Sequence, residues 1–474
     1  MNIQFGTEGW RAIIDKGFNL ENVQICAQAT ADLVKNRNPS DSPQLIIGYD
    51  TRLKSDEFAK SVAEVFAGNS ITVLLNDKAV PTPVISHAVW SGNVAGGVII
   101  TASHNPANYN GYKLKMPDGA SASSEIISQL EHYIRLQEKN RVINKLPLDV
   151  AMKSGLVKKT DLGSAYIEHL ENSLDLDRIR SAGIKIIHDP MYGSGIGYFS
   201  QILNQGTTKV KNIHGVKDSS FPRLNQPEPV ENNLTELSKA VKSNNYDIGI
   251  ANDGDADRVG IVDEAGRVVT ALETFALICL YQLEVLKKRG PIIRSITQTS
   301  MIDKLGEIYG VPVIQTEVGF KHIAPLIKSH GALVAGEESG GFTIDGHMPD
   351  RDGILSGILI LDMIAQTGKS VTELIDWLFK LVGCHYYKRI DTEFNLNHRE
   401  EILLKLSAGN FTSLGGMELD SINTMDGFKF NLKNGAWMLI RFSGTEPLLR
   451  TYAEGNSLEE VNSLLQAAQE IISV

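Results

Sequence analysis

Segments of strand length and segments of helical periodicity alternate along most of this 474-residue chain. Short apolar runs at residues 45–50, 71–75 and 98–100 are each followed by a stretch whose apolar residues recur at helical spacing. Two parallel strands need a crossover connection, usually a helix, so the alternation predicts helices packed on mainly parallel sheets. The chain is therefore expected to be an α/β protein, long enough for three or four domains.

The alternation divides the chain into units, and the last unit has a different pattern. A first α/β unit is expected over residues 1–150, a second over 151–267 and a third over 268–383. The polar segment 139–159 has little periodicity and is interpreted as the linker that closes the first unit. Residues 384–474 combine strand-like runs with one terminal helix, which predicts an α+β unit with antiparallel strands.

Three of the expected strands run into loops of small and polar residues, one loop in each α/β unit. These loops contain Ser103, Asp253 and Glu337. In open α/β sheets, ligands bind outside the carboxyl ends of the strands. Three such loops from three units are therefore expected to converge on one cleft.

The first of these loops follows the apolar run 97–100 and ends at Pro106. Proline lacks a backbone donor and pushes the residue before it out of helical geometry, so Ser103 is expected at the end of a strand. With His104 beside it, this serine can be an attacking hydroxyl that changes its phosphorylation state. The alternative is a polar turn after a strand. Lys113 is a candidate for proton transfer or charge stabilisation, with a surface lysine as its alternative.

The second loop places Asp253, Asp255 and Asp257 at alternate positions. Three carboxylates this close repel one another unless a cation lies among them, and oxygen ligands suit Mg²⁺ or Ca²⁺. An EF-hand is excluded because its sixth position must be glycine and is Arg258 here, and because both flanks have strand patterns. A solvated acidic turn is the remaining alternative. Mg²⁺ completes its shell with phosphate oxygens, one of which a phosphorylated Ser103 would supply.

A loop near the C-terminus has the composition of a phosphate-binding cradle, for which an ordinary β-turn is the alternative. Two arginines, two hydroxyl side chains and a glycine that exposes backbone N–H groups occur together there, namely Arg441, Ser443, Gly444, Thr445 and Arg450. In the third loop, Glu337 and Ser339 offer an acceptor and a hydroxyl suited to the hydroxyl groups of a sugar. The glycines of 193–198 are interpreted as structural, because Tyr198 occupies the last position of the G-x-G-x-x-G pattern.

Charge and composition restrict the class of partner and the compartment. The formal net charge of −10 argues against a nucleic-acid surface, although a local basic pocket can still bind a small anion. Cys26, Cys279 and Cys384 have neither metal-ligand nor disulfide spacing, which indicates a reducing compartment. No apolar stretch approaches the ~20 residues that span a bilayer, and the first residues lack a signal-peptide pattern. We therefore expect a cytoplasmic protein with no membrane or nucleic-acid partner, and the sequence makes no prediction of its oligomeric state.

Four motifs, taken in order, resemble those of the α-D-phosphohexomutase family, which includes phosphoglucomutases, phosphomannomutases and phosphoglucosamine mutases. They are Gly-Thr-Glu-Gly-Trp-Arg at 6–11, Thr-Ala-Ser-His-Asn-Pro at 101–106, Asp-Gly-Asp-Ala-Asp-Arg at 253–258 and the loop that begins at Arg441. The resemblance covers nearly the whole chain. It implies three α/β domains and a smaller phosphate-binding domain, arranged around a central cleft.

The resemblance also implies a role for each motif. Ser103 would be the phosphoserine, and the three aspartates would hold Mg²⁺ together with its phosphate. Four residues would surround the transferring phosphoryl group: Arg11, His104, Lys113 and Arg258. Glu337 and Ser339 would bind sugar hydroxyls, Lys321 would meet the phosphosugar, and the Arg441 loop would bind the phosphate that does not move.

The same resemblance implies a phosphoglucomutase that interconverts glucose 1-phosphate and glucose 6-phosphate through glucose 1,6-bisphosphate. Residues 336–341 are similar to the glucose branch, because phosphoglucosamine mutases usually have glutamine in place of Glu338 and histidine in place of Gly341. The alternatives are a phosphomannomutase or a bifunctional glucose/mannose mutase, then a phosphoglucosamine mutase or a phosphopentomutase. Two other functions are further alternatives. A phosphatase would leave the serine phosphate open to water, and a non-catalytic sugar-phosphate sensor would not need the phosphoryl donor that Ser103 provides.

Overall fold

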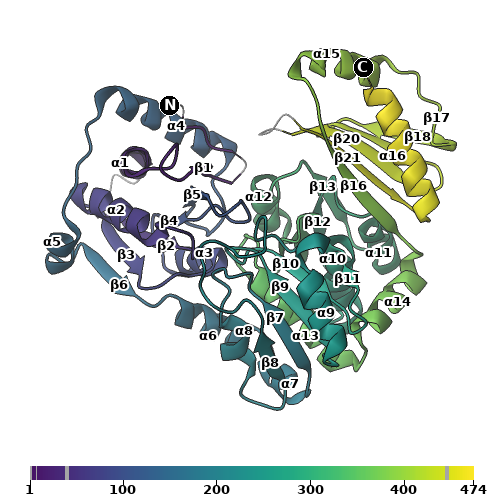
Figure 1. Ribbon diagram of the computed structural model, residues 1–474, viewed down its shortest axis with the longest axis horizontal. Helices are drawn as coiled ribbons and strands as arrows, with labels where there is room; N and C mark the ends of the chain where they lie inside the picture. The colour runs from purple at the N-terminus through teal and green to yellow at the C-terminus, as the bar shows by residue number, and fades with distance from the viewer. Residues whose placement is uncertain (1–2, 7, 38–41, 444–447, 474) are drawn as a thin grey trace.

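The computed structural model describes residues 3–6, 8–37, 42–443 and 448–473. Its strands form four sheets that follow one another along the chain. In Figure 1 the colour runs from the purple first unit, through the teal and green second and third units, to a last unit that ends in yellow. This arrangement confirms the expected order of three α/β units and a C-terminal unit of a different kind.

The first sheet has six strands in the order β1-β5-β4-β2-β3-β6. The strands β4, β2, β3 and β6 pair in parallel, and β5 and β1 add an antiparallel edge. The strands are β1 (Trp10–Ile13), β2 (Gln44–Tyr49), β3 (Thr72–Asn76), β4 (Gly96–Ile100), β5 (Tyr109–Lys115) and β6 (Val157–Thr160). The helices are α1 (Leu20–Arg37), α2 (Ser55–Gly68), α3 (Thr82–Ser91), α4 (Ser124–Asn140) and α5 (Leu148–Lys153).

The expectation of a linker over 139–159 is wrong, because this segment contains α5 and most of β6. β6 pairs in parallel with β3 at the edge of the first sheet, where Val157 is buried while Lys158 and Lys159 are exposed. Lysines on an exposed edge strand are common, and they remove the apolar pattern by which a strand is recognised. We therefore propose that the first unit ends near residue 160 rather than at residue 150.

The second sheet has the order β11-β10-β9-β7-β8. β7 pairs in parallel with β8 and β9, whereas β9 and β10 form an antiparallel hairpin whose connection is the aspartate loop. This ladder fixes both ends of the loop, with Asn252 opposite Val259. The elements are α6 (Gly163–Ser173), α7 (Leu176–Ser181), β7 (Lys185–Asp189), α8 (Tyr198–Leu203), β8 (Lys209–Asn212), the 3₁₀ turn η1 (Glu231–Asn233), α9 (Thr235–Ser243), β9 (Ile248–Asn252), β10 (Val259–Val262) and β11 (Val268–Val269).

The third sheet has the order β13-β12-β14-β15, and its last pair is an antiparallel hairpin whose connection contains Glu337. In the described part of the chain no single helix is long and apolar enough to cross a membrane. Only α13 and α14 taken together reach that length and apolar composition, and the two helices are bent by 86° relative to each other. The elements are α10 (Ala271–Leu280), the π-helical turn η2 (Tyr281–Val285), β12 (Ile292–Ser295), α11 (Met301–Tyr309), β13 (Val313–Thr316), α12 (Phe320–His330), β14 (Val334–Gly336), β15 (Phe342–Ile344), α13 (Gly353–Thr367) and α14 (Val371–Val382).

The fourth sheet has the order β16-β21-β20-β19-β18-β17, and all of its described pairs are antiparallel, as expected. Helix α16 packs on this sheet and contributes Val461 and Leu464 to its core. The elements are β16 (Tyr386–Glu393), the 3₁₀ turn η3 (Leu396–His398), α15 (Arg399–Ala408), β17 (Ser413–Leu414), β18 (Met417–Asn423), β19 (Phe428–Leu432), β20 (Trp437–Phe442), β21 (Leu448–Gly455) and α16 (Leu458–Ile472).

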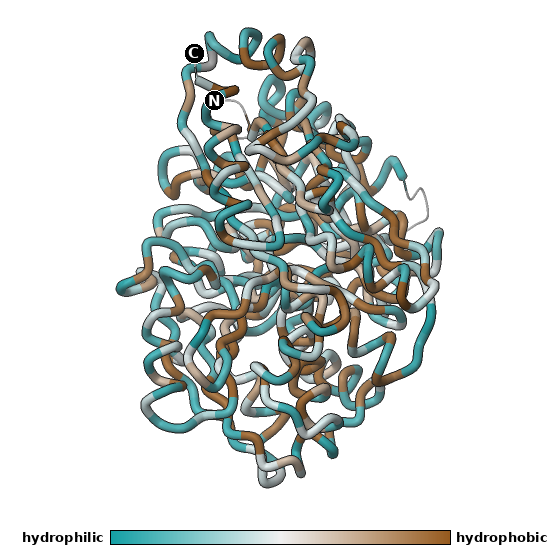
Figure 2. Tube along the Cα trace, turned by 90° about the vertical axis from the view of Figure 1, so that its right-hand side faces the viewer, coloured by the Kyte–Doolittle hydropathy of each residue, from teal (hydrophilic) through white to brown (hydrophobic). Residues whose placement is uncertain are grey.

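One buried apolar cluster runs through the first three units, and Figure 2 shows hydrophobic segments, in brown, recurring along the whole trace. It includes Ile85 of α3, Phe199 of α8 and Ile358 of α13. Fully burying such side chains contributes ~1.5–3 kcal/mol each, so this shared core fixes the three loops relative to one another. The last unit has its own core and meets the third unit through a small cluster that contains Ile296 and Trp437.

Lys429 of β19 places a buried ammonium group at this smaller interface. Its Nζ donates to the backbone oxygen of Ile296 over 2.9 Å and lies 3.9 Å from the centre of the Trp437 ring. Burial, reinforced by the charge of Arg294, lowers the pKa of Lys429 to about 7. The interface between the last two units therefore contains a group that titrates near neutral pH.

We expect the unfolding free energy of the wild type to rise with pH, relative to the Lys429→Met variant, between about 7 and 10.5. In this window the unfolded chain keeps the lysine proton and the folded chain loses it, so stability rises by up to ~1.4 kcal/mol per pH unit. Urea unfolding of both proteins from pH 6 to pH 10 measures the difference. A difference that does not change with pH would contradict the prediction.

Candidate active site

Ser103 lies just beyond the carboxyl end of the buried strand β4. Its backbone has a φ of +52°, a left-handed conformation that is uncommon outside glycine and is concentrated at functional loops. Its Oγ donates to Asp253 Oδ2 over 2.9 Å and lies 3.4 Å from Nδ1 of His104. The structure thus brings the expected hydroxyl of the first unit against an expected carboxylate of the second.

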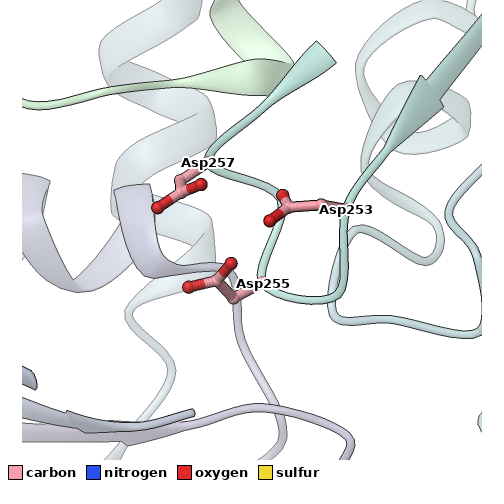
Figure 3. Close-up of side chains that lie close together, drawn as sticks. All are labelled: Asp253, Asp255 and Asp257. Carbon is pink, nitrogen blue, oxygen red and sulfur yellow. The ribbon is translucent and has the colours of Figure 1, made fainter. Parts of the chain in front are cut away.

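Asp253, Asp255 and Asp257 gather around one point in the connection between β9 and β10 (Figure 3). Each offers a carboxylate oxygen, and the three oxygens lie within 4.8 Å of one another. All three residues are buried, which excludes a solvated acidic turn. Both flanks are strands, which excludes an EF-hand.

Two buried oxygens of this aspartate triad, Asp255 Oδ1 and Asp257 Oδ1, have no hydrogen-bond partner among the described residues. Burial and the charges of Asp257 and Asp255 raise the pKa of Asp253 well above its ordinary value. A divalent cation among the three carboxylates would give the two unpartnered oxygens a partner to bind and would offset the repulsion between the negative charges. The donor set, three carboxylates, therefore fits a hard ion such as Mg²⁺.

Lys113 of β5 neutralises part of the aspartate triad. Its Nζ lies 2.7 Å from Asp255 Oδ2 and 3.3 Å from Asp257 Oδ2. Burial alone would lower the pKa of Lys113, but the two carboxylates outweigh burial and raise it, so the ammonium stays charged. Lys113 is therefore not a surface lysine, and its fixed charge favours charge stabilisation over proton abstraction.

Two glycines allow close backbone packing around the aspartate loop, Gly254 against the Ser103 loop and Gly193 of the β7–α8 connection against Gly254. A Cβ atom at Gly254 would lie 2.5 Å from the backbone oxygen of Ser103. A Cβ atom at Gly193 would lie 2.6 Å from the backbone oxygen of Gly254. Both distances are too short for real Cβ atoms, so these positions need glycine for close backbone packing. This packing explains Gly193 without a dinucleotide site.

Three more residues expected around the phosphoryl group lie at or near the Ser103 loop. Arg11 of β1 donates from Nη1 to Asn105 Oδ1 over 2.6 Å, and Arg258 forms a 2.7 Å ion pair with Glu228. Burial, followed by the positive charges of Arg258 and Arg11, lowers the pKa of His104 well below its ordinary value. The loop therefore holds a neutral imidazole beside two guanidinium groups.

The connection between β14 and β15 contains Glu337 and Ser339. Glu337 accepts from the backbone N–H of Gly319 over 2.8 Å, two residues before Lys321 in the first turn of α12. Burial raises the pKa of Glu337 to about 7 against the opposing charge of Arg351. Ser339 Oγ is buried without a hydrogen-bond partner among the described residues, so it is available to a ligand hydroxyl.

Sequence reasoning missed Arg351, which joins the aspartate loop to the Glu337 loop. Its guanidinium lies 2.5 Å from Asp257 and 3.3 Å from Glu337, and it also pairs with Glu8. A Cβ atom at Gly341 would lie 2.0 Å from Arg351 Cδ, so the stem of the arginine fills the space that a side chain there would need. The available signal was a run of three charged residues directly before the apolar helix α13.

Arg441, near the end of β20, is joined to the third unit through Asp426. Its Nε donates to Asp426 Oδ2 over 2.8 Å, and the same oxygen accepts from the backbone N–H of Val318 over 3.0 Å. On the neighbouring strand β21, Arg450 lies directly opposite Arg441 in the ladder. Two of the expected cradle residues are thus adjacent on the sheet, beside the loop that precedes α12.

Of the other three expected cradle residues, the structure describes only Ser443. Ser443 follows β20, and its backbone N–H donates to the backbone oxygen of Leu448. Gly444 and Thr445 lie outside the described residues. Within the described ranges, no hydrogen bond or ion pair joins Arg441 to Ser103 or to the aspartate triad. The link of Arg441 to another unit is indirect and runs through Asp426 to the backbone of Val318 in the third unit.

Four family models match the chain in sequence order. They are phosphoglucomutase/phosphomannomutase alpha/beta/alpha domain I at residues 2–141, domain II at 164–266, domain III at 273–382 and the C-terminal domain at 404–471. The chain belongs to this phosphohexomutase family, and its class is that of isomerases that transfer a phosphoryl group.

Individual relatives match over almost their full length. A Thermococcus kodakarensis protein named phosphoglucomutase/phosphomannomutase is 30% identical over 98% of this chain and 96% of its own. A phosphoglucosamine/phosphogalactosamine mutase of Sulfurisphaera tokodaii is 30% identical over 99% of this chain and 98% of its own. A crystal structure of a Thermus thermophilus protein described as a phosphomannomutase has a TM-score of 0.86 at 31% identity, covering 100% of this chain and 99% of that one. These names agree on a sugar-phosphate mutase and differ in the sugar.

Proposed function

We propose that the chain is a phosphoglucomutase, which interconverts glucose 1-phosphate and glucose 6-phosphate through a phosphoserine and glucose 1,6-bisphosphate. One observation carries the proposal: the buried hydroxyl of Ser103, held in a left-handed backbone, lies 2.9 Å from Asp253 in a buried triad of aspartates. A phosphate on this hydroxyl would lie among carboxylates, an arrangement that is stable only with added positive charge. The same location suits phosphoryl transfer, in which positioning and charge neutralisation dominate.

The aspartate triad and one oxygen of a Ser103 phosphate would hold Mg²⁺, which when bound neutralises charge on the transferring phosphoryl group. Lys113, Arg11 and Arg258 add fixed positive charge around the same oxygens. A sugar hydroxyl attacks phosphorus, the bond from phosphorus to Ser103 Oγ breaks, and the hydroxyl proton must leave. The departing Ser103 Oγ takes up a proton in the same step, and the neutral His104, with Nδ1 3.4 Å from Oγ, is placed to accept the hydroxyl proton and to pass one to Oγ.

The second half of the reaction needs the bisphosphate to present its other phosphate to Ser103. Contacts that serve both orientations must bind the sugar ring and the outer phosphate, and not the reacting phosphate. The sugar ring would be bound by Glu337, Ser339 and Lys321. The outer phosphate would be bound by the cradle, whose members are Arg441, Ser443, Gly444, Thr445 and Arg450.

Glucose is the proposed sugar, and the packing at Gly341 supports it. The resemblance of 336–341 to the glucose branch depends on this glycine, where phosphoglucosamine mutases usually have histidine. The stem of Arg351 passes 2.0 Å from a Cβ atom at this position, so a histidine would displace the arginine that links Asp257 to Glu337. The names of the relatives favour a mannose-active or glucosamine-active mutase as the second candidate.

Coupled assays on four substrates, each primed with its bisphosphate, test the proposal: glucose 1-phosphate, mannose 1-phosphate, glucosamine 1-phosphate and ribose 1-phosphate. We expect the largest kcat/KM on glucose 1-phosphate. A larger value on another sugar would move the assignment to that sugar. Release of inorganic phosphate without isomerised sugar would indicate a phosphatase, and binding without any turnover would indicate a sensor.

Replacing Arg441 with alanine is expected to raise KM for glucose 1-phosphate by about 10- to 100-fold, because a charge-assisted contact to phosphate contributes ~1.5–3 kcal/mol. The effect on kcat should be smaller, since the phosphate bound there does not react. Steady-state kinetics measure both constants. Lys433→Ala removes an exposed cation from the same unit and serves as the control. An unchanged KM in Arg441→Ala would refute the cradle assignment.

The cytoplasm is the proposed location. Cys26, Cys279 and Cys384 are all free thiols, and the first two are buried. Free thiols are typical of proteins in reducing compartments, which supports the proposal.

A further inference from the structure

Arg52, in the loop between β2 and α2, is a buried arginine that the proposed chemistry does not use. Its side chain has no solvent exposure. Nη2 donates to the backbone oxygens of Ser103 and Asn105, each over 2.5 Å. Nη1 donates to the backbone oxygens of Pro106 and Tyr109, over 2.8 Å and 3.1 Å. One guanidinium therefore binds four carbonyl groups of the loop that contains the proposed phosphoserine.

Asp50 connects the same guanidinium to the amide side of Ser103. Its Oδ2 lies 3.3 Å from Arg52 Nε and accepts from Thr101 Oγ1 over 2.6 Å. Thr101 Oγ1 in turn accepts the backbone N–H of Ser103 over 2.8 Å. Both backbone polar groups of Ser103 are thus held, directly or through one hydroxyl, by a single buried ion pair. Such restraint is what a residue with a φ of +52° requires.

Arg52 also contacts the unit that contains the aspartate triad. The carbon at the centre of its guanidinium lies 5.0 Å from the ring centre of Phe221, a buried residue of the second unit. Gly254 packs so closely on the same carbonyl group that a Cβ atom there would lie 2.5 Å from the Ser103 oxygen. The Ser103 carbonyl oxygen therefore accepts from Arg52 and also packs against the aspartate loop.

We propose that Arg52 is a positioning residue for phosphoryl transfer, which fixes the Ser103 backbone so that Oγ meets Asp253. The proposal rests on the proposed function, because it assumes that Ser103 donates the phosphoryl group. Arg52 touches only the backbone of Ser103, so it acts through the placement of Oγ. The competing role is packing alone, in which Arg52 stabilises the first unit and its loss affects folding without changing the chemical step in the folded fraction.

Lysine at position 52 keeps the positive charge but cannot present two planar nitrogens to four carbonyl groups. We expect Arg52→Lys to lower kcat by about 10²-fold, because a misplacement of about 1 Å in the reacting group has this effect, while KM stays within about threefold. The rate of Ser103 phosphorylation by glucose 1,6-bisphosphate, followed by intact mass, should fall in parallel. Arg294→Lys, which alters a buried arginine outside the loop whose partner, Asp303, is partly exposed, is the control and should leave both rates unchanged.

Chemical rescue separates positioning from packing. In Arg52→Ala, millimolar guanidinium chloride should restore activity severalfold in the fraction that thermal unfolding shows to be native, and ammonium chloride should not. Two results would overturn the proposal: an Arg52→Lys variant with the wild-type kcat, or a loss of activity in Arg52→Ala that unfolded protein explains and guanidinium does not reverse.

If neither Arg52 variant folds, Thr101→Val decides the question: a fall of kcat without a change in KM supports positioning, and an unchanged kcat overturns it. If the wild type itself never becomes phosphorylated on Ser103, the proposed function fails and not this inference alone.

Discussion

Replacing Ser103 with alanine is expected to lower mutase turnover by at least about 10³-fold, because the variant has no oxygen to carry the phosphoryl group. The fold should survive. The side chain of Ser103 makes one strong hydrogen bond, to Asp253, and a hydrogen bond to a charged group contributes about 1.5–3 kcal/mol. Alanine meets the same left-handed backbone as serine, so no new strain arises. A coupled assay and a thermal unfolding curve measure the two effects.

Ser61→Ala provides the matched control for this experiment. Ser61 is also a buried serine of the first unit, but it belongs to α2 and its Oγ accepts from Gln24 of α1. We expect its activity to remain within about twofold of the wild type, with a similar change in stability. Near-normal turnover in Ser103→Ala would exclude Ser103 as the phosphoryl donor.

Removing one charge from the aspartate triad is expected to have opposite effects on stability and on activity. Without a divalent cation, Asp253→Asn should unfold at the same or a higher temperature than the wild type. The reason is that burial and repulsion from Asp257 and Asp255 disfavour its ionised form and raise its pKa. With Mg²⁺ at 100 times its dissociation constant, the wild type should gain ~2.7 kcal/mol of stability and the variant should gain little. Mutase activity of the variant should fall by at least about 10²-fold, since charge neutralisation contributes several kcal/mol to the transition state.

Thermal unfolding with and without MgCl₂, run beside the coupled assay, checks this pattern. Asp149→Asn is the control, because Asp149 is an exposed carboxylate of α5 far from the triad in the fold. It should respond to Mg²⁺ as the wild type does. If Mg²⁺ raised the unfolding temperature of Asp253→Asn as much as that of the wild type, the ion would bind elsewhere.

The α/β architecture was predictable because buried parallel strands are short apolar runs. The strands β2, β3 and β4 are of this kind, with Leu45, Ile46 and Ile47 all buried in β2. β6 was missed because only Val157 contributes to the core. β5 was missed as well, because its sequence Tyr-Asn-Gly-Tyr-Lys-Leu-Lys is polar although most of it is buried. Its polar side chains are satisfied by long-range partners, which local sequence does not reveal.

The candidate site shows the same limit. Ser103 and the aspartate triad could be found because each motif carries its chemistry in a few adjacent residues. Arg52 and Arg351 act through partners that are far away in sequence: Arg52 on the loop 103–109, and Arg351 on Asp257 and Glu337. An arginine whose partners are distant in sequence has no local signature. Such residues become visible only when the fold brings their partners together.

The central claim is that the phosphoryl group on Ser103 moves to the sugar. A single-turnover experiment tests it most directly: the protein is labelled with radioactive phosphate at Ser103, freed of excess label and mixed with unlabelled glucose 1-phosphate. We expect the label to leave the protein and to be recovered in glucose 1,6-bisphosphate and glucose 6-phosphate. Label that stays on the protein, or that is recovered as inorganic phosphate, would contradict it.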